Sequence, residues 1–233
     1  CHRAIEVGPE DRFLCLLPMF HSFSWTVNVL LPIRLGATIV ILETLLPFEP
    51  VLKTIWDRKI TVFCGVPPIF AALTQKIQGW KALLVRFLNP VRVAISGASP
   101  LPAAVHREFE AKFRRPLIEG YGLTEASPVV AVNPLHKERK PGTVGLPLPG
   151  VHVKIIDDYD RPCPTGEVGE VCVKGANVMA GYFKHPAETR AAVTEDGWLK
   201  TGDLGCLDAQ GYLTIVDRKK DLIITSGGKN VAP

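Results

Sequence analysis

Residues 91–125, VRVAISGASPLPAAVHREFEAKFRRPLIEGYGLTE, decide the fold because they contain a strand, a helix and a second strand in succession. The two β-type runs lie at about 91–97 and 116–121. Between them, apolar residues recur every four positions and share one helical face: Leu101, Val105, Phe109 and Phe113. Pro102 suits the first turn of this helix. The pattern predicts a β-α-β unit, in which the helix crosses between two parallel strands.

The chain before this unit shows the same alternation of strand-like and helix-like segments. Further strands are expected at about 13–19, 37–42 and 60–66. After about residue 130 the runs become short and alternating, as in 151–156 and 167–173, with a short helix expected near Pro186 to Ala192. The sequence therefore predicts an α/β fold, with a parallel sheet and crossover helices followed by a smaller, mostly antiparallel β subdomain.

Shifts in composition mark the expected boundaries between these parts. The composition shifts at Pro134 to Pro141, Gly and Pro punctuate the short runs after about residue 130, and Lys and Arg cluster near Asp217. We expect an α/β subdomain at 1–133, a β-rich subdomain at 134–216 and the start of a further domain at 217–233. The chain begins Cys-His-Arg without a Met and stops soon after two glycines, so we expect a piece of a larger protein.

Composition and charge argue against several classes of protein. A hydrophobic content of 47% in 233 residues supports a large buried core and argues against disorder. The net charge of +4 is spread without a basic and aromatic stripe, so nucleic-acid binding is not indicated. The longest apolar stretch, 23–42, is interrupted by Asn28, Pro32 and Arg34 and is unsuited to span a bilayer, while peripheral membrane association stays open.

The cysteines and histidines show no metal-binding or disulfide pattern. The six cysteines contain no C-x-x-C pair, and three of them lie in strand-like apolar runs. They are interpreted as reduced core residues of a cytosolic protein. The six histidines do not cluster, which disfavours a structural zinc site.

Glycine-rich segments follow both strands of the 91–125 unit. Residues 96–100 follow the first strand, and residues 120–124 follow the second. Since open parallel sheets bind ligands beyond the carboxyl ends of their strands, the two loops predict one shared crevice. The alternative for each loop is an ordinary turn after a strand.

The second of these loops carries the groups that a nucleotide and a magnesium ion require. Gly120 and Gly122 allow the main chain to approach a ligand closely, and Tyr121 offers a ring face to a base. Thr124 offers a hydroxyl to a phosphoryl oxygen, and Glu125 offers a hard oxygen to Mg²⁺.

Four motifs occur in the order and approximate spacing of adenylate-forming enzymes. They are YGLTE at 121–125, GTVG at 142–145, GWLKTGDL at 197–204 and DRKKD at 217–221. On these residues nearly the whole chain resembles that superfamily, which includes acyl-CoA synthetases, amino-acid adenylation domains and luciferases. It looks most like a long-chain fatty acid CoA ligase. The resemblance implies ATP and Mg²⁺ as cofactors: a carboxylic acid attacks ATP to give an acyl adenylate, and CoA as co-substrate then displaces AMP.

The resemblance also implies a role for each matching residue. Thr124 would contact the α-phosphate and Glu125 would hold the metal ion. Asp203 would accept hydrogen bonds from the ribose, with a turn acid as the alternative, and Arg218 would add a second contact, with a surface arginine as the alternative. The other nucleotide-binding residues implied are Gly97, Ala98, Ser99, Glu119, Gly120, Tyr121 and Gly122.

The acyl side of the site is implied by residues near the end of the first strand. His21 resembles a catalytic residue that lines the acyl and phosphate pocket, and Trp25 resembles the aromatic gate of long-chain ligases. Gly97 would pack against the acyl chain as well as the adenine. The alternatives are a structural histidine, a core tryptophan, and small residues that only allow the next helix to begin. Amino-acid-activating relatives carry an Asp where His21 stands, so an amino-acid substrate is disfavoured, and the apolar neighbours fit a hydrocarbon tail.

Parts of the family's machinery are expected outside this chain. The loop that grips the β and γ phosphates should precede residue 1, and the C-terminal domain with its adenylation lysine should follow residue 233. Lys220 matches the hinge residue, and 227–229 match a linker loop, because the G-x-x-x-x-G-K-[ST] spacing is absent. We therefore expect the isolated chain to be inactive. Other readings are a non-catalytic nucleotide-binding homologue, a luciferase-like oxygenase and an aryl-acid-activating relative; acyl chain length and oligomeric state stay open.

Overall fold

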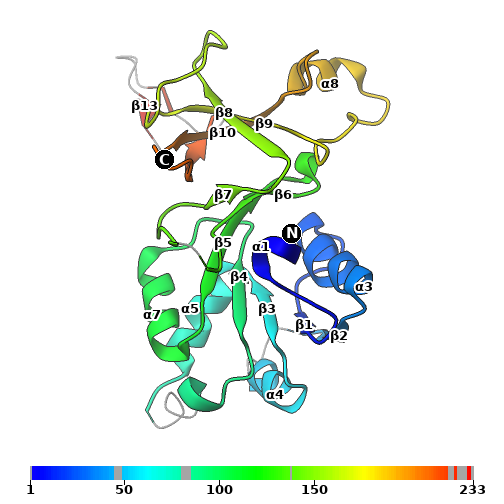
Figure 1. The fold of residues 1–233 in the computed structure, drawn as a ribbon, viewed down its shortest axis with the longest axis vertical. Helices are drawn as coiled ribbons and strands as arrows, with labels where there is room; N and C mark the ends of the chain where they lie inside the picture. Colours follow the sequence, from blue (N-terminus) through cyan, green and yellow to red (C-terminus); the bar gives the residue numbers. More distant parts are fainter. Residues whose placement is uncertain are drawn as a thin grey trace.

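The computed structural model of the chain describes residues 2–44, 49–79, 85–136, 138–219, 223–224 and 230–231. It contains a seven-stranded sheet covered by helices and a four-stranded sheet beyond one end of it (Figure 1). The larger sheet confirms the predicted α/β part. The smaller sheet confirms the predicted antiparallel β part.

The seven-stranded sheet begins with five parallel strands, and each of them overlaps a predicted strand. In spatial order they are β2 (Thr38–Ile41), β1 (Arg12–Cys15), β3 (Val62–Gly65), β4 (Val93–Ser96) and β5 (Leu117–Gly122). Because the strands are parallel, the loops that follow them leave from the same edge of the sheet.

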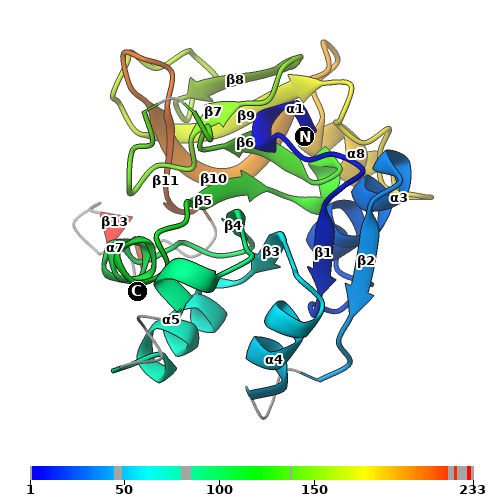
Figure 2. The ribbon, with the colours of Figure 1, turned by 60° about the horizontal axis from the view of Figure 1, so that its bottom comes forward.

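Helices cover both faces of this sheet, so its inner strands are buried on both sides. One face carries α4 (Glu49–Asp57), α5 (Pro67–Lys76) and α7 (Ala103–Phe113), as Figure 2 shows. The other face carries α1 (His2–Ile5), the short α2 (Ser22–Ser24), the π-helix η1 (Trp25–Leu30) and α3 (Leu31–Leu35). Alternate strand residues therefore serve two cores: in β1, Leu14 packs in the first and Phe13 in the second.

Helix α7 packs through the predicted apolar stripe. Phe109 and Phe113 are buried and stack with ring centroids 4.3 Å apart, and Phe109 meets Phe70 of α5 edge-on at 5.4 Å. The helix begins at Ala103 because Pro102, with ψ near 130°, takes the N-cap position. Leu101 is buried in the same core although it precedes the helix.

Two antiparallel strands complete the large sheet. They are β6 (Val129–Val132), which pairs with β5, and β7 (Leu146–Pro147), which pairs with β6. The large sheet thus extends beyond residue 133, and the composition change at 134–141 lies in the connection between β6 and β7. The division of the chain at residues 133 and 216 stays a prediction.

The second sheet is a four-stranded antiparallel unit in the order β11-β10-β9-β8. Its strands are β8 (Val151–Ile156), β9 (Gly169–Gly175), β10 (Leu199–Leu207) and β11 (Leu213–Arg218). The predicted short helix is α8 (Pro186–Ala192), between β9 and β10. Two further strands, β12 (Ile223–Ile224) and β13 (Asn230–Val231), pair with each other. A third apolar core joins this sheet to β6, with Val171, Val173, Leu199 and Leu213 packed near Val130.

The Gly142–Gly145 motif links the two sheets. The backbone N–H groups of Val144 and Leu213 donate to the Leu213 and Gly145 carbonyls, both at 2.8 Å, and the Asn133 side chain donates to the Thr143 carbonyl at 2.6 Å. Gly145 has φ near +88°, and a Cβ there would lie 2.1 Å from the Asn133 nitrogen. A glycine is required at 145 because both the left-handed backbone and the neighbouring chain exclude a side chain.

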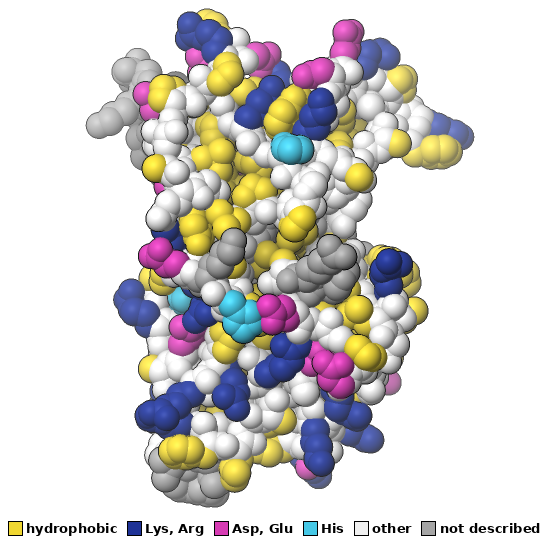
Figure 3. All heavy atoms as spheres, in the orientation of Figure 1, with side chains coloured by type: hydrophobic (Ala, Val, Ile, Leu, Met, Phe, Trp, Pro, Cys, Tyr) yellow, Lys and Arg dark blue, Asp and Glu magenta, His cyan; other side chains and the backbone are white. Residues whose placement is uncertain are grey.

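The surface carries mixed charges, and three cysteines lie in the interior. On the face shown in Figure 3, Lys and Arg side chains are scattered, with acidic side chains between them. Cys15, Cys64 and Cys172 are buried free thiols, as expected of core cysteines. Within the described ranges, no helix has both the length and the apolar character needed to cross a membrane.

Candidate functional site

The loops after β1, β4 and β5 meet at the carboxyl edge of the large sheet. The hydroxyl oxygens of Ser22 and Thr124 lie 3.0 Å apart, although 102 residues separate them in the chain. The Phe23 ring covers Gly97 so closely that a Cβ at residue 97 would lie 3.1 Å from Phe23 Cζ. The structure therefore brings Gly97 and Thr124 close to the segment that contains His21 and Trp25.

The loop after β4 departs from ordinary backbone geometry. Ala98 has φ near +69°, a left-handed conformation that costs a residue with a Cβ about 1 kcal/mol or more. Gly97 is buried and donates to the Gly65 carbonyl at 3.2 Å, while Ala98 and Ser99 are exposed. The loop thus presents Ala98 and Ser99 to solvent.

The glycines of β5 approach the protein's own backbone. A Cβ at Gly120 would lie 3.3 Å from the Ala131 carbonyl oxygen, and one at Gly122 would lie 2.0 Å from the Pro128 carbonyl oxygen. Both neighbours belong to β6 or to the turn before it. These glycines accommodate the returning chain, and the close approach of a ligand that the sequence predicts there stays a prediction.

The buried carboxylate of Asp203 joins the two sheets near the turn that follows β5. The Tyr121 hydroxyl of β5 donates to Asp203 Oδ2 of β10 at 2.5 Å, and Arg218 Nε of β11 lies 3.5 Å from Asp203 Oδ1. Asp203 is 8% exposed, and it lies directly opposite Arg218 in the β10–β11 ladder. Asp203 is therefore a strand residue rather than a turn acid, and Arg218 is exposed but ion-paired.

Burial governs the titration of this pair. Burial raises the pKa of Asp203, and the hydrogen bond from Tyr121 and the charge of Arg218 oppose the rise. Burial, with the adjacent Asp203 charge, also raises the pKa of Tyr121, so the phenol stays protonated and remains a donor. Such a carboxylate can accept further hydrogen bonds from hydroxyl groups of a ligand.

Glu125 lies in the 3₁₀ turn η2 (Thr124–Ala126), which follows β5. Its Oε1 accepts a hydrogen bond from the Tyr182 hydroxyl at 2.9 Å, and its backbone carbonyl accepts from the Met179 N–H at 2.8 Å. The carboxylate is partly exposed and the adjoining Thr124 is exposed. No sequence motif indicated Tyr182, because only the fold brings it to a residue 57 positions earlier.

Glu119 is buried and binds the residue that directly follows the exposed loop after β4. Its carboxylate Oε1 accepts from the Leu101 N–H at 2.9 Å, and the residue is only 9% exposed. Burial raises the pKa of Glu119, with the Leu101 hydrogen bond opposing the rise. The side chain connects β5 to the segment that enters α7, and its predicted contact with a nucleotide stays a prediction.

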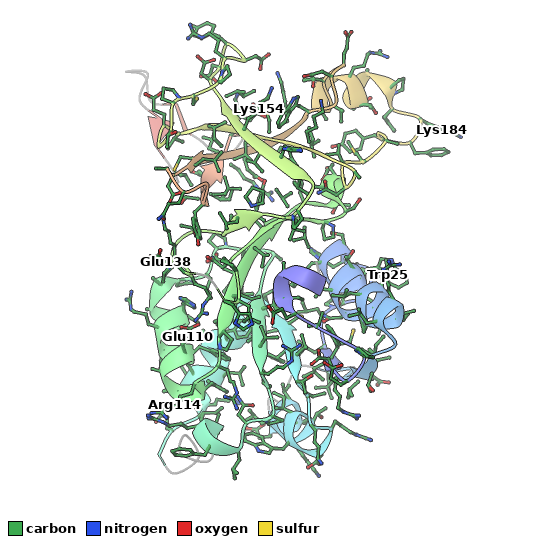
Figure 4. All side chains as sticks on the ribbon, viewed as in Figure 1. Trp25, Glu110, Arg114, Glu138, Lys154 and Lys184 are labelled. Atoms are coloured by element: carbon green, nitrogen blue, oxygen red, sulfur yellow. The ribbon has the colours of Figure 1, made fainter. Side chains whose placement is uncertain are left out.

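His21 and Trp25 lie at the start of the helical segment after β1. His21 is the N-cap of α2, and its Nδ1 accepts from the Phe23 N–H at 3.3 Å, which gives it a structural role. Trp25 begins η1 and is 48% exposed, so it is not a core tryptophan (Figure 4). Lys220 and residues 227–229, the expected hinge and linker, lie outside the described residues.

The oxygen ligands around Glu125 suit a magnesium ion that phosphate oxygens bind at the same time. Within the described ranges, no group of three or more His, Cys, Asp or Glu side chains is placed to hold a metal on its own. Mg²⁺ commonly takes one or two carboxylates and completes its shell with phosphate oxygens and water. A partly exposed Glu125 beside the Thr124 hydroxyl suits that arrangement.

Comparisons with known proteins agree with the motifs. The family model described as AMP-binding enzyme matches residues 1–183. The chain is 36% identical over 218 residues to the long-chain-fatty-acid–CoA ligase of Escherichia coli O6:H1, covering 94% of this chain and 38% of that protein. It is 38% identical over 232 residues to the sulfoacetate–CoA ligase of Cupriavidus necator, covering 97% of this chain and 43% of that protein.

A solved structure matches the fold at similar identity. The O-succinylbenzoate coenzyme A synthetase of Bacillus subtilis, in complex with ATP and a magnesium ion, superposes with a TM-score of 0.87 at 32% identity, over 100% of this chain and 46% of that one. The chain thus spans less than half the length of each of these proteins. The resemblance seen in the four motifs is confirmed, and the chain belongs to the AMP-binding enzyme family, the adenylate-forming enzymes.

Proposed function

We propose that the protein to which this chain belongs is an AMP-forming acid–thiol ligase. In its first step an oxygen of a carboxylic acid attacks the α-phosphorus of ATP, and the bond to the bridging oxygen breaks to release pyrophosphate. In the second step the CoA thiol attacks the acyl carbon and AMP leaves. Both steps move negative charge, so rate acceleration depends on positioning and on preorganised charge rather than on a nucleophilic side chain.

One observation carries this proposal: Tyr121 and Asp203, from separate family motifs, are joined by a 2.5 Å hydrogen bond beside the turn that holds Thr124 and Glu125. Asp203 would accept from the ribose hydroxyls, and Arg218 would stay paired with the same carboxylate. Thr124 would donate to the α-phosphate, and Glu125 would hold the magnesium ion that offsets the phosphate charge. Gly97, Ala98 and Ser99 would border the adenine.

A medium- or long-chain fatty acid is the proposed substrate. The long-chain-fatty-acid–CoA ligase relative supports it, as do two exposed aromatic residues near the site, Phe20 at 93% and Trp25 at 48% exposure. Burying a hydrocarbon tail is favourable by about 0.8 kcal/mol per methylene group. The sulfoacetate and O-succinylbenzoate relatives define the competing classes, a small anionic acid and an aryl acid.

Pyrophosphate release by the full-length protein tests both parts of the proposal. ATP, Mg²⁺ and CoA are supplied with acids from acetate to palmitate, together with sulfoacetate and an aryl acid. We expect release that increases toward the longer chains, and near-complete loss of release in Glu125→Ala. A preference for acetate, sulfoacetate or the aryl acid would overturn the fatty-acid assignment. No release with any acid would favour a nucleotide-binding homologue without catalysis.

A further inference from the structure

The Tyr182 hydroxyl donates a 2.9 Å hydrogen bond to Glu125 Oε1, and no family motif noted in the sequence includes this tyrosine. Among the described residues it is the one side chain that donates to the Glu125 carboxylate. Tyr182 lies on the loop between β9 and α8, and Glu125 lies on the turn after β5. The contact therefore connects the second sheet's loop to the candidate metal ligand.

The segment that carries Tyr182 binds the turn that contains Glu125 through several other hydrogen bonds. The Asn177 side-chain amide donates to the carbonyls of Ala126 at 3.0 Å and Val129 at 3.3 Å. The Met179 N–H donates to the Glu125 carbonyl at 2.8 Å. The backbone of the turn is thus fixed independently of the Tyr182 hydroxyl, which binds the carboxylate itself.

Tyr182 is itself anchored on the first turn of α8. Its backbone N–H donates to Thr189 Oγ1 at 2.9 Å, and that hydroxyl donates to the His185 carbonyl at 2.8 Å. The preceding Gly181 has φ near +146°, and a Cβ there would lie 2.6 Å from Thr189 Cγ2. A glycine is needed for this close approach, which holds the tyrosine at a fixed position. Figure 4 shows Lys184 at the tip of the same loop, directed away from the sheets.

A fixed donor on one carboxylate oxygen restricts rotation of the group and aims the other oxygen. Metal-ligating carboxylates are commonly hydrogen-bonded in this way, and loss of such a partner typically costs 10- to 100-fold in metal affinity. The Tyr182 hydroxyl is the donor in this contact, because an ionised carboxylate can only accept hydrogen bonds. A protonated phenol suits this role because it orients the carboxylate without neutralising its charge.

We propose that Tyr182 is a positioning residue that orients the Glu125 carboxylate toward the magnesium ion of bound Mg·ATP. The inference rests on the proposed function, which assigns Glu125 as the metal ligand. It predicts that the hydroxyl affects how much Mg²⁺ the site requires, and that it acts only through Glu125.

Calorimetric titration of ATP into the full-length protein at a series of Mg²⁺ concentrations tests the inference without turnover. Tyr182→Phe should raise the Mg²⁺ concentration for half-maximal ATP binding about 10-fold, and saturating Mg²⁺ should restore the affinity. In a Glu125→Gln background, Tyr182→Phe should produce no further shift. Tyr159→Phe is the matched control, since Tyr159 is 79% exposed and its ring lies against Arg161.

Two results would overturn the positioning role. One is an unchanged Mg²⁺ requirement in a folded Tyr182→Phe protein, with folding checked by its melting temperature. The other is an equal shift in the Glu125→Gln background, which would mean that the hydroxyl acts through general stability. If the wild type binds Mg·ATP but activates no acid, the proposed function fails, while the Mg²⁺ titration still decides the role of Tyr182.

Discussion

Asp203 connects the two sheets, and we propose that the same carboxylate also accepts hydrogen bonds from a nucleotide. It is buried, bound by a phenol on one oxygen and paired with an exposed guanidinium on the other. Removing its partners or its charge therefore has consequences both for stability and for binding. Glu119 is likewise buried, and its carboxylate is bound by one backbone N–H, so its removal has consequences for stability.

Replacing Asp203 should weaken nucleotide binding. In the full-length protein, Asp203→Ala removes the acceptor proposed for the ribose hydroxyls, and hydrogen bonds to charged groups contribute about 1.5–3 kcal/mol. We expect ATP affinity to fall about 10- to 100-fold in calorimetric titration. Asp158→Ala, which removes an exposed acid paired with Lys219, is the control and should leave the affinity unchanged. Equal affinity in the two variants would contradict the assignment of Asp203.

Glu119 predicts a specific dependence of stability on pH. Burial raises the pKa of Glu119, so the folded protein binds its proton more tightly than the unfolded chain does. The associated stability is fully present below the ordinary carboxyl pKa of 4.5 and is lost as the pH rises through the folded value. Glu119→Gln keeps an acceptor for the Leu101 N–H and removes the buried charge. Its free energy of unfolding should therefore change less between pH 4 and pH 7 than that of the wild type.

Urea denaturation at a series of pH values measures this effect. Glu119→Ala serves as the comparison, because it leaves the Leu101 N–H without its acceptor and should be about 1–3 kcal/mol less stable than Glu119→Gln at every pH. A Glu119→Gln protein with the full pH dependence of the wild type would show that Glu119 does not carry the raised pKa.

At the scale of elements, the link between the sheets depends on the Gly142–Gly145 motif. Its two glycines both have left-handed backbones, but their surroundings differ. A Cβ at Gly145 would lie 2.1 Å from the Asn133 nitrogen, whereas nothing lies within 4 Å of a Cβ at Gly142. Alanine substitutions at the two glycines therefore measure two costs separately. Gly142→Ala reports the left-handed backbone alone, and Gly145→Ala adds the steric clash with the chain after β6.

Gly145→Ala should destabilise the protein much more than Gly142→Ala. At Gly142 only the left-handed conformation is penalised, by about 1–2 kcal/mol. At Gly145 the clash with backbone adds a further amount of about 1–3 kcal/mol. Thermal unfolding of the two full-length variants provides the measurement. Equal melting temperatures would show that the junction relaxes to accept a side chain.

At the scale of the whole molecule, we propose that the described site supplies groups for the adenosine, the α-phosphate and the metal. The family resemblance places the loop for the terminal phosphates and the adenylation lysine in other segments, and the chain spans 38% of its Escherichia coli relative. On this proposal, the two sheets contribute a nucleotide-binding crevice but not every group that the reaction requires.

The isolated chain should be inactive for this reason. Purified residues 1–233, given ATP, Mg²⁺ and a fatty acid, should show no acid-dependent exchange of pyrophosphate into ATP above background. The full-length protein, assayed in parallel, should show exchange. Exchange by residues 1–233 alone would mean that the groups described here suffice for adenylation.

Local patterns in the sequence predicted much of the fold. The five parallel strands, the apolar stripe of α7 and the short helix α8 each depend on contiguous residues, whose spacing reports which side is buried. β6 and β7 were not predicted in the large sheet, because the change in pattern after residue 130 suggested a separate subdomain, and their pairing with β5 depends on tertiary packing. Residue type alone also left the position of Trp25 open. Its apolar character allowed a core position as an alternative, but in η1 its side chain is half exposed.

The sequence by itself determined the family, the order of the four motifs and the α/β architecture, since these depend on residue types at short spacing. Only the tertiary structure decided that Tyr121 donates to Asp203, that Tyr182 reaches Glu125, and that Gly120 and Gly122 accommodate β6. The physical reason is that a hydrogen bond or a steric contact between residues 57 or 82 positions apart depends on how sheets and loops pack. No local pattern of residues encodes that packing.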